Sequence, residues 1–147
     1  MVSRSSIGVK MGKINSRAKG KSAEREVINL LGELIPKLKL ERNLDQTRDG
    51  GYDIKGLEGW APEVKRYAQI TWGDVENFWK QTVTQARDTG RKPVLFMRED
   101  RSPWVVVVRL TDVMDNVLAE HDWSVAMTCQ LTMAGFVLVY KQHDWDI

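Results

Sequence analysis

The chain has 147 residues, of which 42% are hydrophobic and 29% charged, as expected for a soluble globular protein with one core. No apolar run approaches the roughly 18–20 residues of a membrane-spanning helix, and residues 1–21 lack the apolar stretch of a secretory signal. The single cysteine, Cys129, excludes an internal disulfide and a cysteine-based zinc cluster. We therefore expect a cytoplasmic protein that has no membrane partner.

The charge is unevenly distributed, although the net charge is only +2. Residues 1–21 contain six lysines and arginines and no acidic residue, whereas residues 110–147 contain six acidic residues and one lysine. A basic arm on a balanced body is typical of a protein that binds a polyanion. One alternative interpretation is a solubilising tail. Another is an extension that results from the choice of start codon, because Met11 could also initiate the chain.

The first predicted elements are an arm and a helix. Residues 1–18 are polar and aperiodic, which predicts a basic flexible arm, and we expect a single domain over residues 19–147. Apolar residues at spacings of three and four predict a helix over residues 22–38, with Ser22 as its cap. Pro36 ends this helix or lies just past its end.

Three short strands are predicted next, over residues 38–43, 52–56 and 60–67. The last two, "YDIKG" and "WAPEVKRY", form a hairpin joined by "LEG", and the loop "DQTRDGG" precedes them. Pro62 has no amide hydrogen to donate, so it indicates an edge position or a bulge in its strand.

The second half of the chain is predicted to alternate between helix and strand. A helix that stops at Gly90 is followed by two buried strands, a short helix capped by Thr111 or Asp112, and a largely extended last segment. These predicted elements cover residues 73–90, 92–99, 104–110, 111–120 and 125–142. The order of elements predicts an α/β domain in which helices flank a mixed sheet.

Two carboxylates fall within the predicted hairpin. Asp53 and Glu63 lie on neighbouring strands, which are about 4.8 Å apart, so their side chains can meet on one face. Neighbouring carboxylates repel each other and are costly to desolvate, and a divalent cation removes both problems. Mg²⁺ is bound in proteins by one or two carboxylates together with several waters. The pair therefore predicts a Mg²⁺ site.

Three more groups converge on this pair. Lys65 shares the face of Glu63 because side chains alternate along a strand, and it could activate a water or steady a developing negative charge. The carbonyl oxygen of Val64 could be a further metal ligand, and Glu24 on the preceding helix could hold a water or a second ion. An E-x-K pair alone is typical of a surface salt bridge, but together these groups favour phosphodiester hydrolysis.

The segments "KGKSAEREVINLLGEL", "DGGYDIKG" and "PEVKRY" resemble the PD-(D/E)XK nuclease superfamily, and within it the archaeal-type Holliday junction resolvases and their phage relatives. The resemblance implies a restriction-endonuclease-like fold, Mg²⁺ (which Mn²⁺ can replace) and a homodimer that cuts two strands of a four-way junction. By position it implies catalytic roles for Glu24, Asp53, Glu63 and Lys65. Tyr52 stands where the superfamily motif has proline, a substitution that the superfamily tolerates.

DNA-binding residues are expected around this site. Phosphate contacts from lysine and arginine give affinity without sequence readout. Several branches of the superfamily also have a glutamine on the helix after the motif that points back to the site; Gln85 matches it better than Gln81, and a solvated helix glutamine is the alternative. The expected DNA-binding residues are Arg17, Lys19, Lys21, Arg42, Arg48, Arg66 and Gln85.

The sequence therefore predicts a Mg²⁺-dependent, structure-selective DNA endonuclease, with Holliday junction resolution as the first hypothesis. If phage-encoded, it would act in the host cytoplasm, in DNA recombination. One alternative is another nuclease of this superfamily that cuts flaps, ends or duplex in phage recombination or packaging. The other is a DNA-binding module without activity, which is disfavoured because all four catalytic positions are filled.

Overall fold

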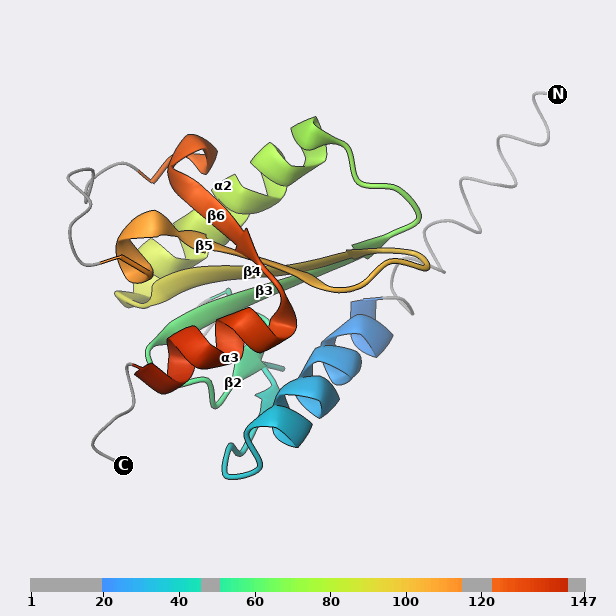
Figure 1. Ribbon diagram of the computed structural model, residues 1–147, viewed down its shortest axis with the longest axis vertical. Coiled ribbons are helices and arrows are strands. Elements are labelled where there is room, and N and C mark those ends of the chain that lie inside the picture. The colour runs from blue at the N-terminus through green and yellow to red at the C-terminus, as the bar shows by residue number, and fades with distance from the viewer. Residues whose placement is uncertain (1–19, 46–50, 115–122, 143–147) are drawn as a thin grey trace, which may run out of the picture.

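The computed structural model describes residues 20–45, 51–114 and 123–142 and shows a sheet with helices packed around it (Figure 1). It begins with an N-terminal helix (residues 20–34). The elements that follow are β1 (Glu41–Arg42), β2 (Ile54–Lys55), β3 (Trp60–Tyr67), α2 (Trp72–Thr89), β4 (Lys92–Glu99), β5 (Val105–Arg109), two 3₁₀ turns (Leu110–Asp112 and Val125–Met127), β6 (Thr128–Leu131) and α3 (Met133–Gln142).

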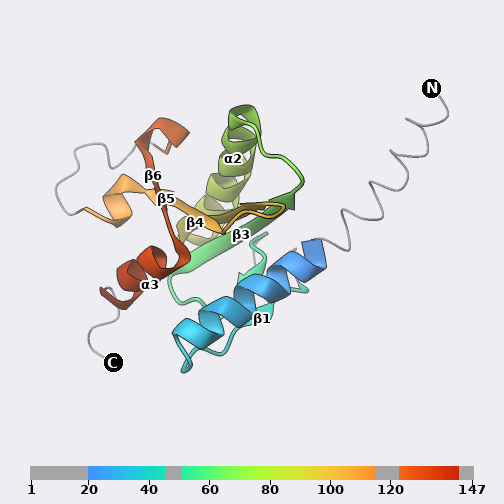
Figure 2. The same cartoon turned by 45° about the vertical axis from the view of Figure 1, so that its right-hand side comes forward.

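The main sheet has the strand order β3-β4-β5-β6. β3 and β4 are parallel, which requires the α2 crossover between them, and the other two pairs are antiparallel. β1 and β2 form a separate two-stranded antiparallel sheet. Figure 2 shows α2 on one side of the main sheet and the N-terminal helix with α3 on the other. The predicted class, α/β with a mixed sheet flanked by helices, is confirmed.

The ends of α2 are fixed by its sequence. Thr71 and Asp74 form a reciprocal capping box, in which each side chain accepts a hydrogen bond from the other residue's backbone amide. Gly90 ends the helix in the left-handed conformation, at φ 69°, which is the conformation that glycine adopts without strain. α2 therefore has a fixed length and begins close to the end of β3.

Each face of the main sheet packs a different core. On the α2 side, Leu95 and Met97 of β4 pack with Val75 and Trp79 of the helix. On the other side, Phe136 of α3 is fully buried and lies edge-on to the rings of Trp60 and Phe96, at centroid distances of 5.2 and 5.4 Å. β4 is buried between the two cores, which explains its continuous apolar run.

The predictions for β3, α2 and β4 are confirmed in position and type, and the structure places β3 at an edge of its sheet, as Pro62 indicated. The N-terminal helix differs from its prediction. It is already helical at residue 20, so Ser22 lies inside it and does not cap it, and it ends at residue 34, before Pro36. The predicted arm, residues 1–18, lies outside the described residues.

The hairpin prediction was wrong in its pairing. β2 pairs with β1 and not with β3, and Asp53 precedes β2 where it was expected in mid-strand. Two backbone hydrogen bonds explain this arrangement: the amide of Asn43 donates to the carbonyl of Asp53, while the amide of Asp53 donates to the carbonyl of Pro62, each at 2.8 Å. Asp53 thus bridges the two sheets.

The C-terminal third shows two further corrections. Thr111 and Asp112 lie within a 3₁₀ turn and do not cap a longer helix; Asp112 binds the side chain of Arg109 instead, and residues 115–122 lie outside the described residues. Residues 133–142 are helical and not extended. Their buried positions recur at helical spacing, and Leu138 is left 66% exposed. None of the helices in the described segments is long and apolar enough to cross a bilayer.

Candidate active site

The carboxylate of Asp53 is held at the outer edge of β3. Its Oδ2 accepts a hydrogen bond of 2.8 Å from the backbone amide of Val64, two residues along from the Pro62 carbonyl that binds the Asp53 amide. The N–H and C=O of one strand residue point to the same side, so the Val64 carbonyl also faces this edge. The geometry therefore brings the predicted ligand oxygens of Asp53 and Val64 to one side of the strand.

Glu63 is the most deeply buried charged residue of the cluster, with only 3% of its surface exposed. Its Oε1 lies 3.3 Å from the ammonium of Lys65. Its Oε2 is buried and receives no hydrogen bond from any donor in the described part of the chain. A buried carboxylate oxygen without a donor is costly unless a proton or a cation occupies it.

The two carboxyl groups hold their protons far more tightly than exposed ones do. Burial raises the pKa of Asp53 to about 6, helped by the negative charge of Glu24 and opposed by the hydrogen bond from Val64. Burial, and then the charge of Asp53, raises the pKa of Glu63 to about 8, against the attraction of Lys65. Each shift shows that this site disfavours two uncompensated negative charges.

The site fits a divalent cation on these grounds. The available donors are hard oxygens from two carboxylates and a carbonyl, which Mg²⁺ and Mn²⁺ prefer, and the bare Oε2 of Glu63 is an open ligand position. No cluster of three or more His, Cys, Asp or Glu side chains arranged for metal binding occurs in the described segments. The protein would thus supply two carboxylates and leave the other positions to backbone, water and substrate, as is usual for Mg²⁺.

The N-terminal helix contributes Glu24 to the same cluster. The charge of Glu24 acts on Asp53, and its Oε2 lies 3.2 Å from Nε of Arg42. Arg42, expected to contact DNA, therefore neutralises Glu24 in the protein alone. The four positions named from sequence, Glu24, Asp53, Glu63 and Lys65, are assembled from a helix, the segment before β2, and β3; their catalytic roles stay predictions.

The other expected DNA-binding residues differ in their surroundings. Lys21 is exposed, whereas Arg66 lies 3.4 Å from Glu26 and 3.5 Å from Asp100 in ion pairs. Gln85 packs near Gly51, two residues before Asp53: a Cβ on Gly51 would lie 3.0 Å from the Cγ of Gln85. Its Oε1 is buried with no hydrogen-bond donor among the described residues. The remaining three, Arg17, Lys19 and Arg48, lie outside the described residues.

Two residues that contact the site or its supports, Glu26 and Phe78, were not identified from the sequence. Glu26 accepts hydrogen bonds from Arg66, Arg98 and the indole of Trp104, and so connects the N-terminal helix to β3, β4 and the residue before β5. Phe78 of α2 lies against Lys65, with the ammonium 5.5 Å from the ring centroid. Both are long-range contacts, and no local spacing predicts them.

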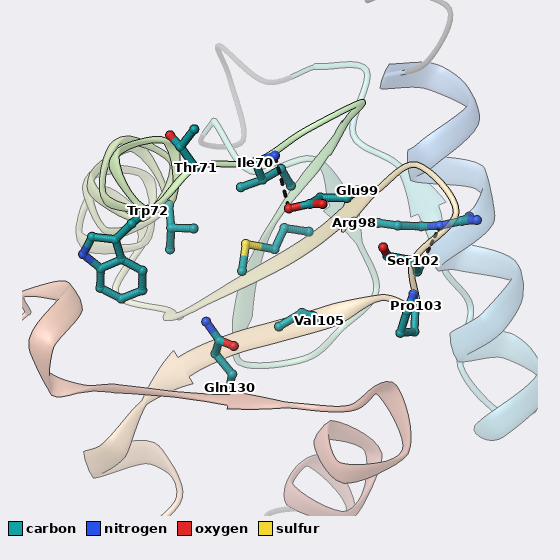
Figure 3. A pocket seen from close by; sticks show the side chains of 11 residues that line it. Ile70, Thr71, Trp72, Arg98, Glu99, Ser102, Pro103, Val105 and Gln130 are labelled. Carbon is teal, nitrogen blue, oxygen red and sulfur yellow. Dashed lines mark hydrogen bonds between the residues drawn. The ribbon is translucent and has the colours of Figure 1, made fainter.

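A pocket of about 390 Å³ lies on the α2 side of the sheet (Figure 3). Its floor includes Met97, which is paired with Lys65 in the β3–β4 register. Trp72 stands at one wall and Gln130 at another, and Glu99 accepts a hydrogen bond of 3.3 Å from the amide of Ile70. The pocket thus shares a face of the sheet with Lys65, which contacts Phe78 of α2.

The mixed sheet, the helix glutamate and the Asp–Glu–Lys cluster at a strand edge have the arrangement expected of a PD-(D/E)XK protein. Residues 15–134 match the family model described as "Phage putative PDDEXK endonuclease", and the chain belongs to this family. No curated protein matches the chain. A solved structure that it resembles is that of Hjc, a Holliday junction resolvase from the archaeal hyperthermophile Archaeoglobus fulgidus, at 17% identity and a TM-score of 0.43, covering 84% of this chain and 88% of that one.

Proposed function

We propose that this protein is a Mg²⁺-dependent DNA endonuclease that cuts branched DNA, with the four-way junction as its preferred substrate. One observation carries the hydrolytic part of the proposal. Asp53 and Glu63 form a buried carboxylate pair with raised pKa values. Glu63 Oε2 has no hydrogen-bond donor among the described residues, while Lys65 lies beside Oε1 of the same group. A buried carboxylate oxygen without a hydrogen-bond donor needs a proton or a cation as its partner, and a cation in this position supports the proposal.

Asp53, Glu63 and the Val64 carbonyl would hold the Mg²⁺. When bound, the ion would supply Lewis acidity toward the scissile phosphate and lower the pKa of a water molecule. The amide of Val64 donates a hydrogen bond to Asp53 and would orient it, and the ammonium of Lys65, 3.3 Å from Glu63 Oε1, would offset negative charge that develops on the phosphate. Glu24 can accept a hydrogen bond from the attacking water and so align it.

The choice of a four-way junction rests on the sequence resemblance to junction resolvases. A junction has two strands to be cut symmetrically, so we propose that the protein acts as a homodimer with one cluster per subunit, in phage DNA recombination. The exposed Lys21 would bind DNA phosphates, together with the basic residues that precede it in the sequence. Mn²⁺ should replace Mg²⁺, because the donors are the same hard oxygens.

Cleavage assays test this proposal directly. The wild-type protein is mixed with a four-way junction, a flap and a linear duplex of matched length, with Mg²⁺, Mn²⁺ or EDTA. We expect paired symmetric nicks on the junction, dependence on the cation, and no cleavage by Asp53→Asn, which should still bind the junction. Glu58→Gln, at an exposed carboxylate between β2 and β3, is the matched control and should cut normally.

The outcomes separate the parts of the proposal. Equal cutting of all three substrates would keep the hydrolytic site and refute junction selectivity. Wild-type cutting by Asp53→Asn would refute the site assignment. Binding without cleavage in either cation would show a DNA-binding module that has lost activity.

A further inference from the structure

The aromatic side chain of Phe78 lies between α2 and the strand that carries the catalytic lysine. The Lys65 ammonium lies 5.5 Å from its ring centroid, within the range of a cation–π interaction. The same ring stacks on Tyr67, with centroids 5.3 Å apart and planes inclined by 16°. Because Lys65 and Tyr67 are two residues apart on β3, both project to the α2 face, where Phe78 contacts each of them.

We propose that Phe78 is a positioning residue that holds the Lys65 ammonium at the scissile phosphate, with Tyr67 fixing the plane of the ring. The proposal deepens the proposed function and rests on it. Lysine has a flexible four-carbon stem and loses much rotamer freedom when it is held in one place. A contact that is already present in the protein alone reduces the freedom that must be lost during the reaction.

Glu63 is the other contact of Lys65, but it has a second proposed role. Its Oε1 lies 3.3 Å from the Lys65 ammonium, and the same carboxyl group is a proposed metal ligand. The ring of Phe78 carries no charge and binds no metal, so its contact with Lys65 does not compete with the cation for a ligand.

A packing role is the competing explanation, because Phe78 is partly buried beside Val75 and Trp79. The two roles differ in which substitutions restore function. Leucine preserves apolar packing and removes the π face, whereas tyrosine and tryptophan preserve the π face. If Phe78 only packs, leucine should be tolerated at least as well as the larger tryptophan.

Kinetics on the junction substrate provide the first test. Phe78→Leu should lower kcat by about two- to thirty-fold, the range of a cation–π contact, and leave KM unchanged. Phe78→Tyr and Phe78→Trp should restore kcat. Lys92→Met is the matched control, because Lys92 makes a similar contact, 5.3 Å from the ring of Trp60, away from the cluster. Wild-type kcat in Phe78→Leu, or a loss that the aromatic variants do not restore, would overturn the proposal.

A double-mutant cycle provides a readout that does not depend on cleavage. Unfolding by urea is measured in EDTA for the wild type, Phe78→Leu, Lys65→Met and the double variant. We expect the two sites to be coupled by about two- to five-fold in the unfolding equilibrium constant. Additive effects would refute the contact between Phe78 and Lys65. Coupling together with a wild type that cuts no DNA would refute the proposed function and leave the contact standing.

Discussion

Replacing Glu63 by glutamine should remove much of the pH dependence of the stability of the metal-free protein. Burial and the neighbouring Asp53 raise the pKa of Glu63 from 4.5 to about 8, so the folded protein keeps this proton over a range in which the unfolded chain releases it. The unfolded state then binds fewer protons than the native state, and the free energy of unfolding falls as the pH rises. This loss begins near pH 4.5 and is complete near pH 8.

The magnitude follows from the shift. At about 1.36 kcal/mol per pKa unit, Glu63 costs the native state on the order of 3 kcal/mol at pH 7 relative to pH 4. Asp53, with its pKa raised to about 6, adds to this slope below pH 6. Glutamine has no proton to release, so Glu63→Gln should be the more stable protein at pH 8 and should lose that advantage toward pH 4.

Urea unfolding in EDTA at intervals between pH 4 and 8.5 measures the effect. Glu58→Gln removes an exposed carboxylate and should follow the wild-type curve. Mg²⁺ should restore wild-type stability at pH 8, because it compensates the charge that a proton compensates at pH 5, and it should help Glu63→Gln much less. If the free energies of unfolding of wild type and Glu63→Gln change with pH in parallel, the inference that burial of Glu63 destabilises its charged form in the absence of metal is refuted.

Three further outcomes follow from the structure. Gly56→Ala should lower the free energy of unfolding by about 3 kcal/mol or more in urea titrations, because φ is +104° and a Cβ would lie 2.2 Å from the Lys39 carbonyl oxygen; a loss below 1 kcal/mol would contradict this. Arg66→Ala should cost about 1 kcal/mol of stability through its lost ion pairs, notably with Glu26. It should leave the salt dependence of DNA binding unchanged. If the slope of log K against log salt concentration instead falls in magnitude by about one, Arg66 contacts a phosphate. Thr71→Ala should cost about 1 kcal/mol by removing the cap of α2, and Thr71→Ser should restore it.

The sequence was informative where structure depends on local patterns. Alternation along a strand was enough to place Glu63 and Lys65 on one face, and β3 and β4 have the predicted bounds. Gly90 marked the end of α2 because few other residues adopt its conformation. These features depend on the φ and ψ preferences and the side-chain direction of each residue, which do not need the rest of the fold.

The sequence failed where distant segments decide the structure. The apolar run 133–142 has no clear polar face, and its helix packs on residues distant in the sequence, among them the Trp60 and Phe96 rings that contact Phe136. The pairing of β2 with β1, and the ring of Phe78 beside Lys65, likewise depend on contacts between separate elements. Spacing can therefore nominate the catalytic residues, but it cannot show what holds them in place.

The position of Asp53 has a consequence for the solution behaviour of its variants. β3 is an edge strand, and an unpaired edge invites strand addition by another copy of the chain. The amide and carboxylate of Asp53 occupy the Pro62 carbonyl and the Val64 amide, and so the acid that is expected to bind metal also closes this edge to self-association. An alanine at this position would remove the hydrogen bond between the Val64 amide and the Asp53 carboxylate, and the variant would then combine inactivity with aggregation. Asparagine retains an acceptor for Val64 and separates the two effects.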